Sequence, residues 1–142
     1  MRLGGVSLPI DFQLVGHSDG DAIAHAVTDA VLGAAGAGDI GEMFSDTDAA
    51  NRGRDSVEML RLAVARVAAL GWRVENVDIT VVAERPYIGP YREQMRAALA
   101  PPLGITAADI GIKGKSNERL GWIGRGEGLA CIAVALLERD GT

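Results

Sequence analysis

The sequence predicts an α/β fold of the α+β type, in which helices pack on one face of a β-sheet and residues 1–142 form a single domain. The length of 142 residues is close to the roughly 150 residues of an average domain. Hydrophobic residues make up 48% of the chain and charged residues 23%, which is typical of a folded globular protein. Segments with helical periodicity alternate with segments rich in β-branched residues, as expected when helices cover a sheet.

The first half of the chain predicts a short strand and then a helix. Residues Leu3–Leu8 are typical of a strand and turn, because two consecutive glycines lie inside them. A helix is predicted over Asp19–Ala35, with Ser18 or Asp19 as its N-cap and Gly36 as its stop. Apolar residues recur at helical spacing and form its expected buried face: Ile23, Ala26, Val27, Ala30, Val31 and Ala34.

The remaining elements follow from similar signals. Asp55, three residues before a glutamate, has the spacing of a capping box and marks the start of a second helix. Pro101 and Pro102 are expected to end a third helix, because proline lacks the backbone N–H. Loops are predicted over Asp39–Asp48 and Ser116–Gly128, which are rich in Gly, Asp and Ser. In chain order, the elements are a helix over Ser56–Leu70, a strand over Trp72–Ala83, a helix over Tyr91–Leu99, a strand over Ile110–Gly114 and a strand over Leu129–Leu137.

The composition disfavours several functional classes. No uncharged apolar run approaches the roughly 20 residues of a membrane helix, and residues 1–5 lack the apolar core of a signal peptide. The single cysteine, Cys131, cannot form an internal disulfide. Fourteen basic against nineteen acidic residues give a net charge of −5, which disfavours nucleic-acid binding. We therefore expect a cytoplasmic protein that binds neither nucleic acid nor membrane.

One stripe of the first predicted helix could bind a metal. Asp21, His25 and Asp29 are spaced i, i+4 and i+8, so they share one helix face. Imidazole and carboxylate groups are zinc ligands, although one helix cannot supply a complete tetrahedral site. The alternative is a solvated face whose N-terminal acid interacts with the helix dipole. His17, at the mouth of the same helix, could hydrogen-bond a phosphate or could be incidental to a capping turn.

Several loops contain residues that suit a phosphorylated ligand. Lys113–Glu118 lies where a strand ends and combines two lysines, a hydroxyl and a carboxylate that could hold magnesium. Ala83–Gly89 follows another strand and could cradle a flat base. Asp46–Asp48, with Asp39 upstream, could bind a cation or hydroxyl groups, or could be only a polar turn. Gly124–Gly128 contains an arginine and a glutamate that could pair with each other.

Four stretches of the chain carry a family resemblance. In their order they resemble the 2-C-methyl-D-erythritol 2,4-cyclodiphosphate synthase family of the non-mevalonate isoprenoid pathway, and the resemblance covers essentially the whole chain. The stretches are HSDGDAIAHAVTDAVLGAAGAGDIGEMFSDTD over His17–Asp48, GRDSVEMLR over Gly53–Arg61, NVDITVVAERP over Asn76–Pro86 and KGKSNERLGWIGRGEGLACIAVALL over Lys113–Leu137.

The resemblance implies a mixed β-sheet, a homotrimer with active sites between neighbouring subunits, and a phosphorus-oxygen lyase activity. Such an enzyme cyclises 4-diphosphocytidyl-2-C-methyl-D-erythritol 2-phosphate to 2-C-methyl-D-erythritol 2,4-cyclodiphosphate and releases CMP. A zinc ion and a magnesium ion would withdraw charge from the phosphates.

Matched residue by residue, the resemblance implies that His17 and Ser116 stabilise the transition state. His25 would bind zinc, Glu118 would bind magnesium, and Asp46 would anchor a hydroxyl of the erythritol part. Further substrate contacts are implied, first for Ser18 at the phosphate, then for Asp39, Ile40, Gly41, Phe44, Ser45, Thr47 and Asp48 around the erythritol part, for Ala83, Glu84, Arg85, Pro86, Tyr87, Ile88, Gly89, Lys115 and Asn117 around cytidine diphosphate, and for Trp122 and Arg125 near the trimer axis.

The chain departs from the family pattern at its beginning. The family opens with a strand carrying an Asp-x-His pair, and both residues bind zinc together with the helix histidine. Met1 aligns after that strand, so His25 would be the one remaining ligand of three. We expect that the natural enzyme carries the missing segment. The alternatives are a weakly active form that uses magnesium alone or a substitute ligand, and an inactive trimer that binds CDP-like ligands.

Overall fold

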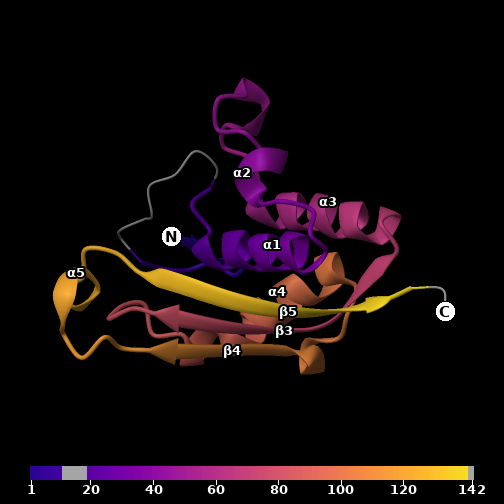
Figure 1. Cartoon of the computed structure of the whole chain (residues 1–142). Coiled ribbons are helices and arrows are strands. Elements are labelled where there is room, and N and C mark those ends of the chain that lie inside the picture. Colours follow the sequence, from indigo (N-terminus) through magenta and orange to yellow (C-terminus); the bar gives the residue numbers. More distant parts are fainter. Residues whose placement is uncertain (11–18, 141–142) are drawn as a thin grey trace.

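The computed structural model describes residues 1–10 and 19–140, and its central feature is a three-stranded sheet (Figure 1). Strand β3 (Trp72–Val82) lies in the middle, between β4 (Ile110–Lys115) and β5 (Ala130–Arg139). The second half of β3 pairs in parallel with β4, and the whole of β3 pairs antiparallel with β5, with one register shift near its start. The sheet is therefore mixed, as the family resemblance implied.

One face of this sheet is apolar and covered, and the other is open. Along β3 the buried residues alternate, so that Ile79 and Val81 both point to the covered face. The same alternation in β5 leaves Ile132, Val134 and Leu136 between 56% and 66% exposed on the other face. The sheet thus buries only one of its two surfaces within the chain.

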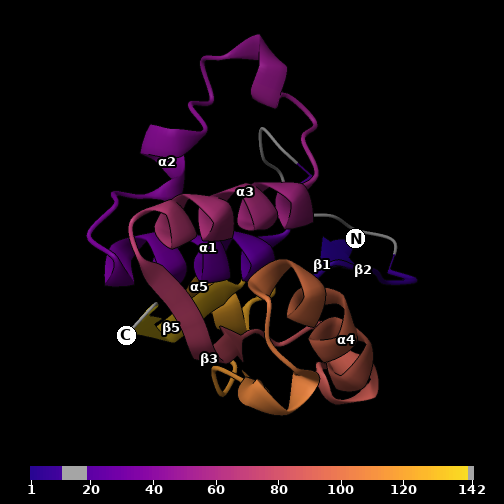
Figure 2. The same ribbon diagram turned by 90° about the vertical axis from the view of Figure 1, so that its right-hand side faces the viewer.

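Three helices cover the apolar face (Figures 1 and 2). Helix α1 (Ala22–Ala34) lies against β5, α3 (Ser56–Ala69) packs on α1 and β3, and α4 (Arg92–Leu103) packs on α3 and β4. Helices on one face of a sheet are the predicted architecture, which is confirmed. Among the described residues, no helix is both long and apolar enough to cross a membrane.

The core between the helices and the sheet is built mainly from aliphatic side chains, together with Met95. The predicted buried face of α1 is only partly correct. Helix α1 contacts both α3 and β5, so the face that it buries differs from the predicted one. Three alanines of the predicted set are therefore not buried. Of that set Ile23, Val27 and Val31 are buried, Ala26, Ala30 and Ala34 are not, and Ala24, Thr28 and Leu32 are buried in addition.

The chain begins with a two-stranded hairpin. Strands β1 (Arg2–Leu3) and β2 (Val6–Ser7) pair antiparallel, and Gly4 and Gly5 link them. Their φ angles of 62° and 76° are both positive, which is the requirement of the tight hairpin turn that matches strand twist. The short strand and turn predicted over Leu3–Leu8 are therefore confirmed, although they form a separate small sheet.

A buried carboxylate joins this hairpin to the first helix. The Asp21 side chain is fully buried and accepts hydrogen bonds from the N–H groups of Gly4 and Gly5, at 2.8 and 2.7 Å. It also accepts from Ala24 N at 3.0 Å and is the N-cap of α1. The prediction of Asp19 as the cap is therefore wrong, because the Asp19 carboxylate is directed to α3 instead.

The helix predicted to end at Leu99 continues to Leu103. Pro101 and Pro102 lie in its last turn, where each lacks the N–H group that would donate to the carbonyl four residues earlier, so the helix loses two hydrogen bonds there. Gly104 follows with a φ of 70°, and two N–H groups beyond the helix bond back to carbonyls of its last turn. This capping motif and the burial of Leu99 and Leu103 hold the last turn despite the prolines.

Two predicted loops contain short helical turns. Residues Ile40–Met43 form α2 within the segment 39–48, because the Asp39 side chain caps them. Residues Gly121–Gly124 form α5 within the segment 116–128. In Figures 1 and 2, α2 and the chain after it rise away from the sheet. Three single 3₁₀ turns complete the described elements: Ala49–Asn51, Gly89–Tyr91 and Ala107–Asp109.

We predict that Asp21→Asn destabilises the protein by about 2–4 kcal/mol, because an amide turns one buried acceptor into a donor facing a backbone N–H. Urea unfolding followed by circular dichroism measures the free energy of unfolding. The matched control is Asp55→Asn at the exposed N-cap of α3, where asparagine caps as well as aspartate and the change should stay within about 0.5 kcal/mol. Equal effects of the two substitutions would contradict the role given to Asp21.

Candidate functional site

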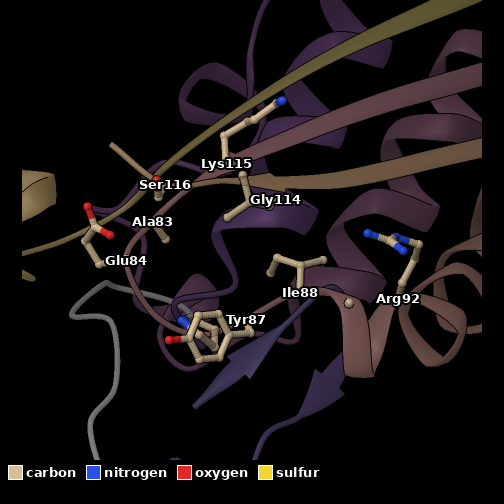
Figure 3. Close-up of a pocket in the computed structure, with 11 residues that line it drawn as sticks. Ala83, Glu84, Tyr87, Ile88, Arg92, Gly114, Lys115 and Ser116 are labelled. Carbon is tan, nitrogen blue, oxygen red and sulfur yellow. The ribbon is translucent and has the colours of Figure 1, made fainter. Parts of the chain in front are cut away.

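The main pocket lies where the two parallel strands end. Because β3 and β4 run in parallel, their last residues, Val82 and Lys115, meet at the same edge of the sheet. The segments that follow them lie side by side and enclose a pocket of about 410 Å³ (Figure 3). The pocket is lined by Val81, Ala83, Glu84, Pro86, Tyr87, Ile88, Gly89, Arg92, Gly114, Lys115 and Ser116.

Hydrogen bonds between the two segments fix the shape of this pocket. Ala83 N donates to Lys115 O at 2.9 Å, which extends the pairing of β3 and β4 by one residue. The Glu84 carboxylate accepts from Arg119 N at 2.8 Å. The loop after β3 and the loop after β4 are therefore tied to each other at two points.

The pocket has an apolar floor between polar ends. Ile88 is buried beside Gly114, where an added Cβ atom would lie 3.1 Å from Ile88 Cγ1. A glycine at this position therefore leaves room for the loop to approach the strand. Figure 3 shows Ser116 and Glu84 on one side of the pocket and Arg92 on the other. Arg92 Nε donates to a backbone carbonyl of β4 at 2.8 Å, which fixes its position.

Most of the residues predicted for this region line the pocket, but three do not. Arg85 lines a neighbouring hollow of about 380 Å³. Asn117 donates its side-chain amide to a carbonyl of its own loop at 2.8 Å, and Glu118 is exposed with a φ of 53°. Sequence reasoning missed Arg92, because only the packing of α4 against β4 brings it here. The predicted residues that do line the pocket are Ala83, Glu84, Pro86, Tyr87, Ile88, Gly89, Lys115 and Ser116.

A second pocket, of about 260 Å³, lies beside α1, α2 and α3. Its lining combines His25 with predicted loop residues, and it also includes Asn51 and Met59, which sequence reasoning missed. Asn51 reaches it because its side-chain amide donates to the Ser45 carbonyl, six residues earlier, at 2.8 Å. The lining residues are His25, Ile40, Gly41, Phe44, Asp46, Asn51 and Met59.

The other predicted residues of this loop shape its backbone. Asp39 caps α2 by accepting from a backbone N–H at 2.8 Å, and Asp48 caps the following 3₁₀ turn in the same way at 3.0 Å. The hydroxyl oxygens of Ser45 and Thr47 lie 2.7 Å apart. Asp46 is the carboxylate of this loop that reaches the second pocket.

The predicted stripe of Asp21, His25 and Asp29 does not form one metal site. Asp21 is the buried cap of α1, and Asp29 Oδ1 accepts from Ile40 N at 2.8 Å, which holds α2 beside α1. Both carboxylates are thus engaged by backbone N–H groups of neighbouring segments. Of the three, only His25 lines the second pocket.

His25 contacts Ser56 on another helix, and Ser56 is hydrogen-bonded to Asp19. Its Nε2 atom lies 2.7 Å from Ser56 Oγ, at the first residue of α3. Ser56 in turn donates through its hydroxyl and its N–H to the Asp19 carboxylate. Arg2 Nε lies 3.2 Å from the same carboxylate. Sequence reasoning did not anticipate this cluster, because its hydrogen bonds join residues up to 37 positions apart.

The electrostatics of this cluster keep Asp19 ionised. Burial alone would raise the pKa of Asp19, but the hydrogen bonds from the Ser56 hydroxyl and N–H, the Asp21 N–H and the charge of Arg2 outweigh it and lower the pKa below its ordinary value. Burial raises the pKa of the Cys131 thiol to about 12, and the charge of Asp21 adds to this effect. Cys131 is therefore protonated at neutral pH and is not a nucleophile.

The remaining predicted residues lie away from both pockets or outside the described chain. Arg125 and Glu127 pair at 3.1 Å, as predicted, just after α5. Trp122 lies on α5, is half-exposed, and lines neither pocket. His17 and Ser18 lie outside the described residues. Within residues 1–10 and 19–140, the linings of these two pockets have no residue in common: Asp46 lines one and Ser116 lines the other.

Within the part of the chain that the structure describes, no group of three or more His, Cys, Asp or Glu side chains is arranged to hold a metal ion. His25 and Glu118, the two predicted metal ligands, therefore do not complete a site with other described residues. Each can supply at most one ligand.

Comparison with known proteins gives a consistent picture at the level of sequence. The YgbB family model matches residues 1–138. A protein of Gemmatimonas aurantiaca named 2-C-methyl-D-erythritol 2,4-cyclodiphosphate synthase is 64% identical over 137 residues, which cover 96% of this chain and 82% of that protein. A protein of the same name from Aromatoleum aromaticum is 55% identical over 139 residues, which cover 98% and 84% of the two chains.

Solved structures give the same picture at the level of fold. The bifunctional IspDF from Campylobacter jejuni superposes with a TM-score of 0.94 at 39% identity, over 98% of this chain and 38% of that longer chain. The IspF of Plasmodium falciparum, in a complex with CDP, superposes with a TM-score of 0.87 at 34% identity, over 99% of this chain and 85% of that one.

We predict that Gly124→Ala disrupts the loop that carries Ser116. A Cβ atom at this position would lie 2.1 Å from the backbone carbon of Arg119, so α5 or the loop must move. The expected cost is about 1–3 kcal/mol of unfolding free energy, measured in urea, together with faster hydrogen exchange at Arg119 N.

Gly33→Ala is the control for that substitution. Gly33 lies in α1 with open space around it, and alanine there should stabilise the helix by about 0.5–1 kcal/mol. A Gly124→Ala protein with unchanged stability and unchanged exchange at Arg119 would show that the close approach of α5 does not constrain the loop.

Proposed function

This chain belongs to the YgbB family, and we propose that it is a lyase that cyclises 4-diphosphocytidyl-2-C-methyl-D-erythritol 2-phosphate to 2-C-methyl-D-erythritol 2,4-cyclodiphosphate and releases CMP. This places it in the non-mevalonate route of isoprenoid biosynthesis. The observation that carries the proposal is the pocket at the ends of β3 and β4, which brings the segments 83–89 and 114–116 together. Relatives that are 50–64% identical over nearly the whole chain bear the name of this activity.

The reaction needs positioning more than covalent work by the protein. The 2-phosphate oxygen forms a bond to the β-phosphorus, the bond from that phosphorus to the bridging oxygen breaks, and CMP leaves with the electron pair. Holding the attacking and leaving oxygens in line supplies most of the rate in such phosphoryl transfers. We assign Ser116 and His17 to stabilising the charge that builds up on the transferred phosphorus group.

The main pocket suits the cytidine diphosphate part of this substrate. Its floor at Ile88 is apolar and accepts a flat base, and Ser116 and Lys115 bring a hydroxyl and a charge near one end. A relative from Plasmodium falciparum has been solved as a CDP complex, which supports the same ligand here. Glu84, Tyr87 and Gly89 complete the walls that we assign to the nucleotide.

The second pocket suits the erythritol part, with Asp46 as the hydroxyl anchor and Ile40, Gly41 and Phe44 as walls. Because Asp46 and Ser116 line different pockets of one chain, we propose that a neighbouring subunit brings the two halves together in a homotrimer. The open face of β5 supports this assembly. It presents the apolar side chains of Ile132, Val134 and Leu136, which a second copy would bury.

The resemblance implies a zinc ion and a magnesium ion. The described residues offer one ligand for each of them. His25 lines the second pocket, and its Nε2 atom lies 2.7 Å from Ser56 Oγ, a contact of the kind that orients a zinc-binding imidazole. Glu118 is an exposed carboxylate in the loop of Ser116, which suits one magnesium ligand. Such ions, when bound, withdraw charge from phosphate oxygens. Trp122 and Arg125 are assigned to contacts near the trimer axis.

An inactive trimer that binds CDP is the alternative. The identity of 50–64% to relatives named for the activity favours the enzyme over this alternative. We also propose a cytoplasmic location, as expected for a pathway whose substrates are phosphorylated small molecules.

We predict measurable CMP release from the cytidyl substrate in the presence of zinc and magnesium, followed by chromatography. Ser116→Ala should lower kcat by about 10²–10³-fold, because a hydrogen bond to the developing charge is lost. Calorimetry with CDP should show a much smaller loss of affinity for this variant than its loss of kcat, because the rest of the pocket lining is unchanged. CDP binding without any turnover by the wild-type protein would favour the inactive homologue, and absence of both would exclude either function.

We predict that Val134→Glu breaks the proposed trimer, because it places a charge in the middle of the apolar stripe on β5. Analytical ultracentrifugation should give a trimer for the wild type and a monomer for this variant. Leu70→Glu is the control, since Leu70 is also about half-exposed but lies just after α3. If both variants and the wild type sediment alike, the β5 face is not the subunit interface.

A further inference from the structure

The chain between α2 and α3 carries Asp46 on an exposed segment. In Figures 1 and 2 this part of the chain rises away from the sheet. Residues 46–50 are all exposed, whereas Phe44 and Asn51, on either side of the segment 45–50, are only 8% and 5% exposed. Both of these buried side chains line the second pocket together with Asp46. The position of Asp46 therefore depends on how the two ends of the segment are held.

The Arg54 side chain contacts both ends of this segment. Arg54 Nη1 donates a hydrogen bond to Asn51 Oδ1 at 2.8 Å. The guanidinium carbon lies 5.1 Å from the centre of the Phe44 ring, which is within the range of a cation–π contact. Asn51 in turn donates its side-chain amide to the Ser45 carbonyl at 2.8 Å. These contacts converge on Phe44 and Ser45, the two residues that precede Asp46.

The backbone brings Arg54 back to Asn51. Arg54 N donates to Asn51 O at 3.2 Å and closes a four-residue turn. Arg52 has φ and ψ angles of −66° and 126°, and Gly53 has a φ of 67°, which is the pattern of a type II turn. The second central residue of such a turn needs a positive φ, which glycine adopts without strain. The turn thus places the Arg54 side chain beside the end of the exposed segment.

Arg54 lines neither pocket, so it can act on the second pocket only through the residues that it contacts. Its planar guanidinium group lies over the Phe44 ring and donates to Asn51 at the same time. A lysine would bring a single charged nitrogen without this fork of donors, so it would reproduce the two contacts only in part.

We propose that Arg54 is a positioning residue that clamps Phe44 and Asn51 and thereby holds the Asp46 carboxylate in the second pocket, where it receives the erythritol part of the substrate. The identity of that ligand rests on the proposed function, whereas the clamp rests on the contacts of Arg54. Because Arg54 lies outside the main pocket, its loss should weaken binding of the erythritol part and spare the cytidine part.

Amide hydrogen exchange, followed by NMR, measures the clamp in the ligand-free protein. Asp48 N and Asn51 N donate to Ser45 O and Asp48 O, at 3.2 and 3.0 Å. We expect exchange at both N–H groups to be about tenfold faster in Arg54→Ala, because a cation–π contact and a hydrogen bond are lost. Arg52→Ala is the matched control, since Arg52 belongs to the same turn and its side chain is exposed. It should leave both exchange rates unchanged.

Substrate binding is the second readout. Arg54→Ala should raise KM for the cytidyl substrate about tenfold and change kcat by less than about threefold, because loss of an interaction made equally in the ground and transition states raises KM alone. Its Kd for CDP, which lacks the erythritol part, should stay within about twofold of the wild-type value by calorimetry. Arg54→Lys should give smaller changes in exchange and KM, and it carries both measurements if the alanine variant does not fold.

Unchanged exchange at Asp48 N and Asn51 N in Arg54→Ala would overturn the clamp. Faster exchange with an unchanged KM, or an equal loss of affinity for CDP, would overturn the role of Arg54 toward the erythritol part. The exchange measurement needs no turnover, so it separates this inference from the proposed function. If Arg54→Ala exchanges faster but the wild-type protein releases no CMP, the clamp is retained and the enzymatic assignment is lost.

Discussion

The parallel pairing of β3 with β4 is the constraint on which the main pocket depends. Hydrogen bonds in register from Val77 to Val82 place the ends of both strands at one edge of the sheet. The segments that follow β3 and β4 therefore begin side by side. They form a pocket between them. The antiparallel partner β5 runs the opposite way, so it contributes length and burial to the sheet and leaves this edge to the two loops.

The one-sided burial of the sheet has a different consequence. Three helices suffice to cover one face of three strands, and the chain has no further element on the opposite face among its described residues. Aliphatic side chains of β5 therefore remain exposed there, which is unfavourable for an isolated monomer. In the same chain, the predicted substrate residues Asp46 and Ser116 line two separate pockets. The trimer that we propose would account for both observations, because neighbouring copies would bury the open faces and join the pockets.

Buried polar groups join the hairpin, the helices and the second pocket. Asp21 satisfies two backbone N–H groups of the hairpin turn and one of α1, which offsets the cost of burying its charge. Asp19, two residues earlier, does the same for the start of α3 and lies behind His25 through Ser56. The segment HSDGD therefore contributes structure through its two aspartates, one to the hairpin and one to α3. A motif that is read as a functional signature can thus also be a folding element.

The sequence by itself determined the main helices and strands, the position of the helices on one face of the sheet, and the loops that border the main pocket. These features follow from local periodicity, caps and turn residues, and a family resemblance supplied the mixed sheet. Tertiary structure decided the rest. The capping role of Asp21, the continuation of α4 through Pro101 and Pro102, and the contact of Ser56 with His25 depend on partners distant in sequence. Hydrogen-bond partners and burial depend on how the chain packs, so they cannot be predicted from the spacing of residues along the sequence.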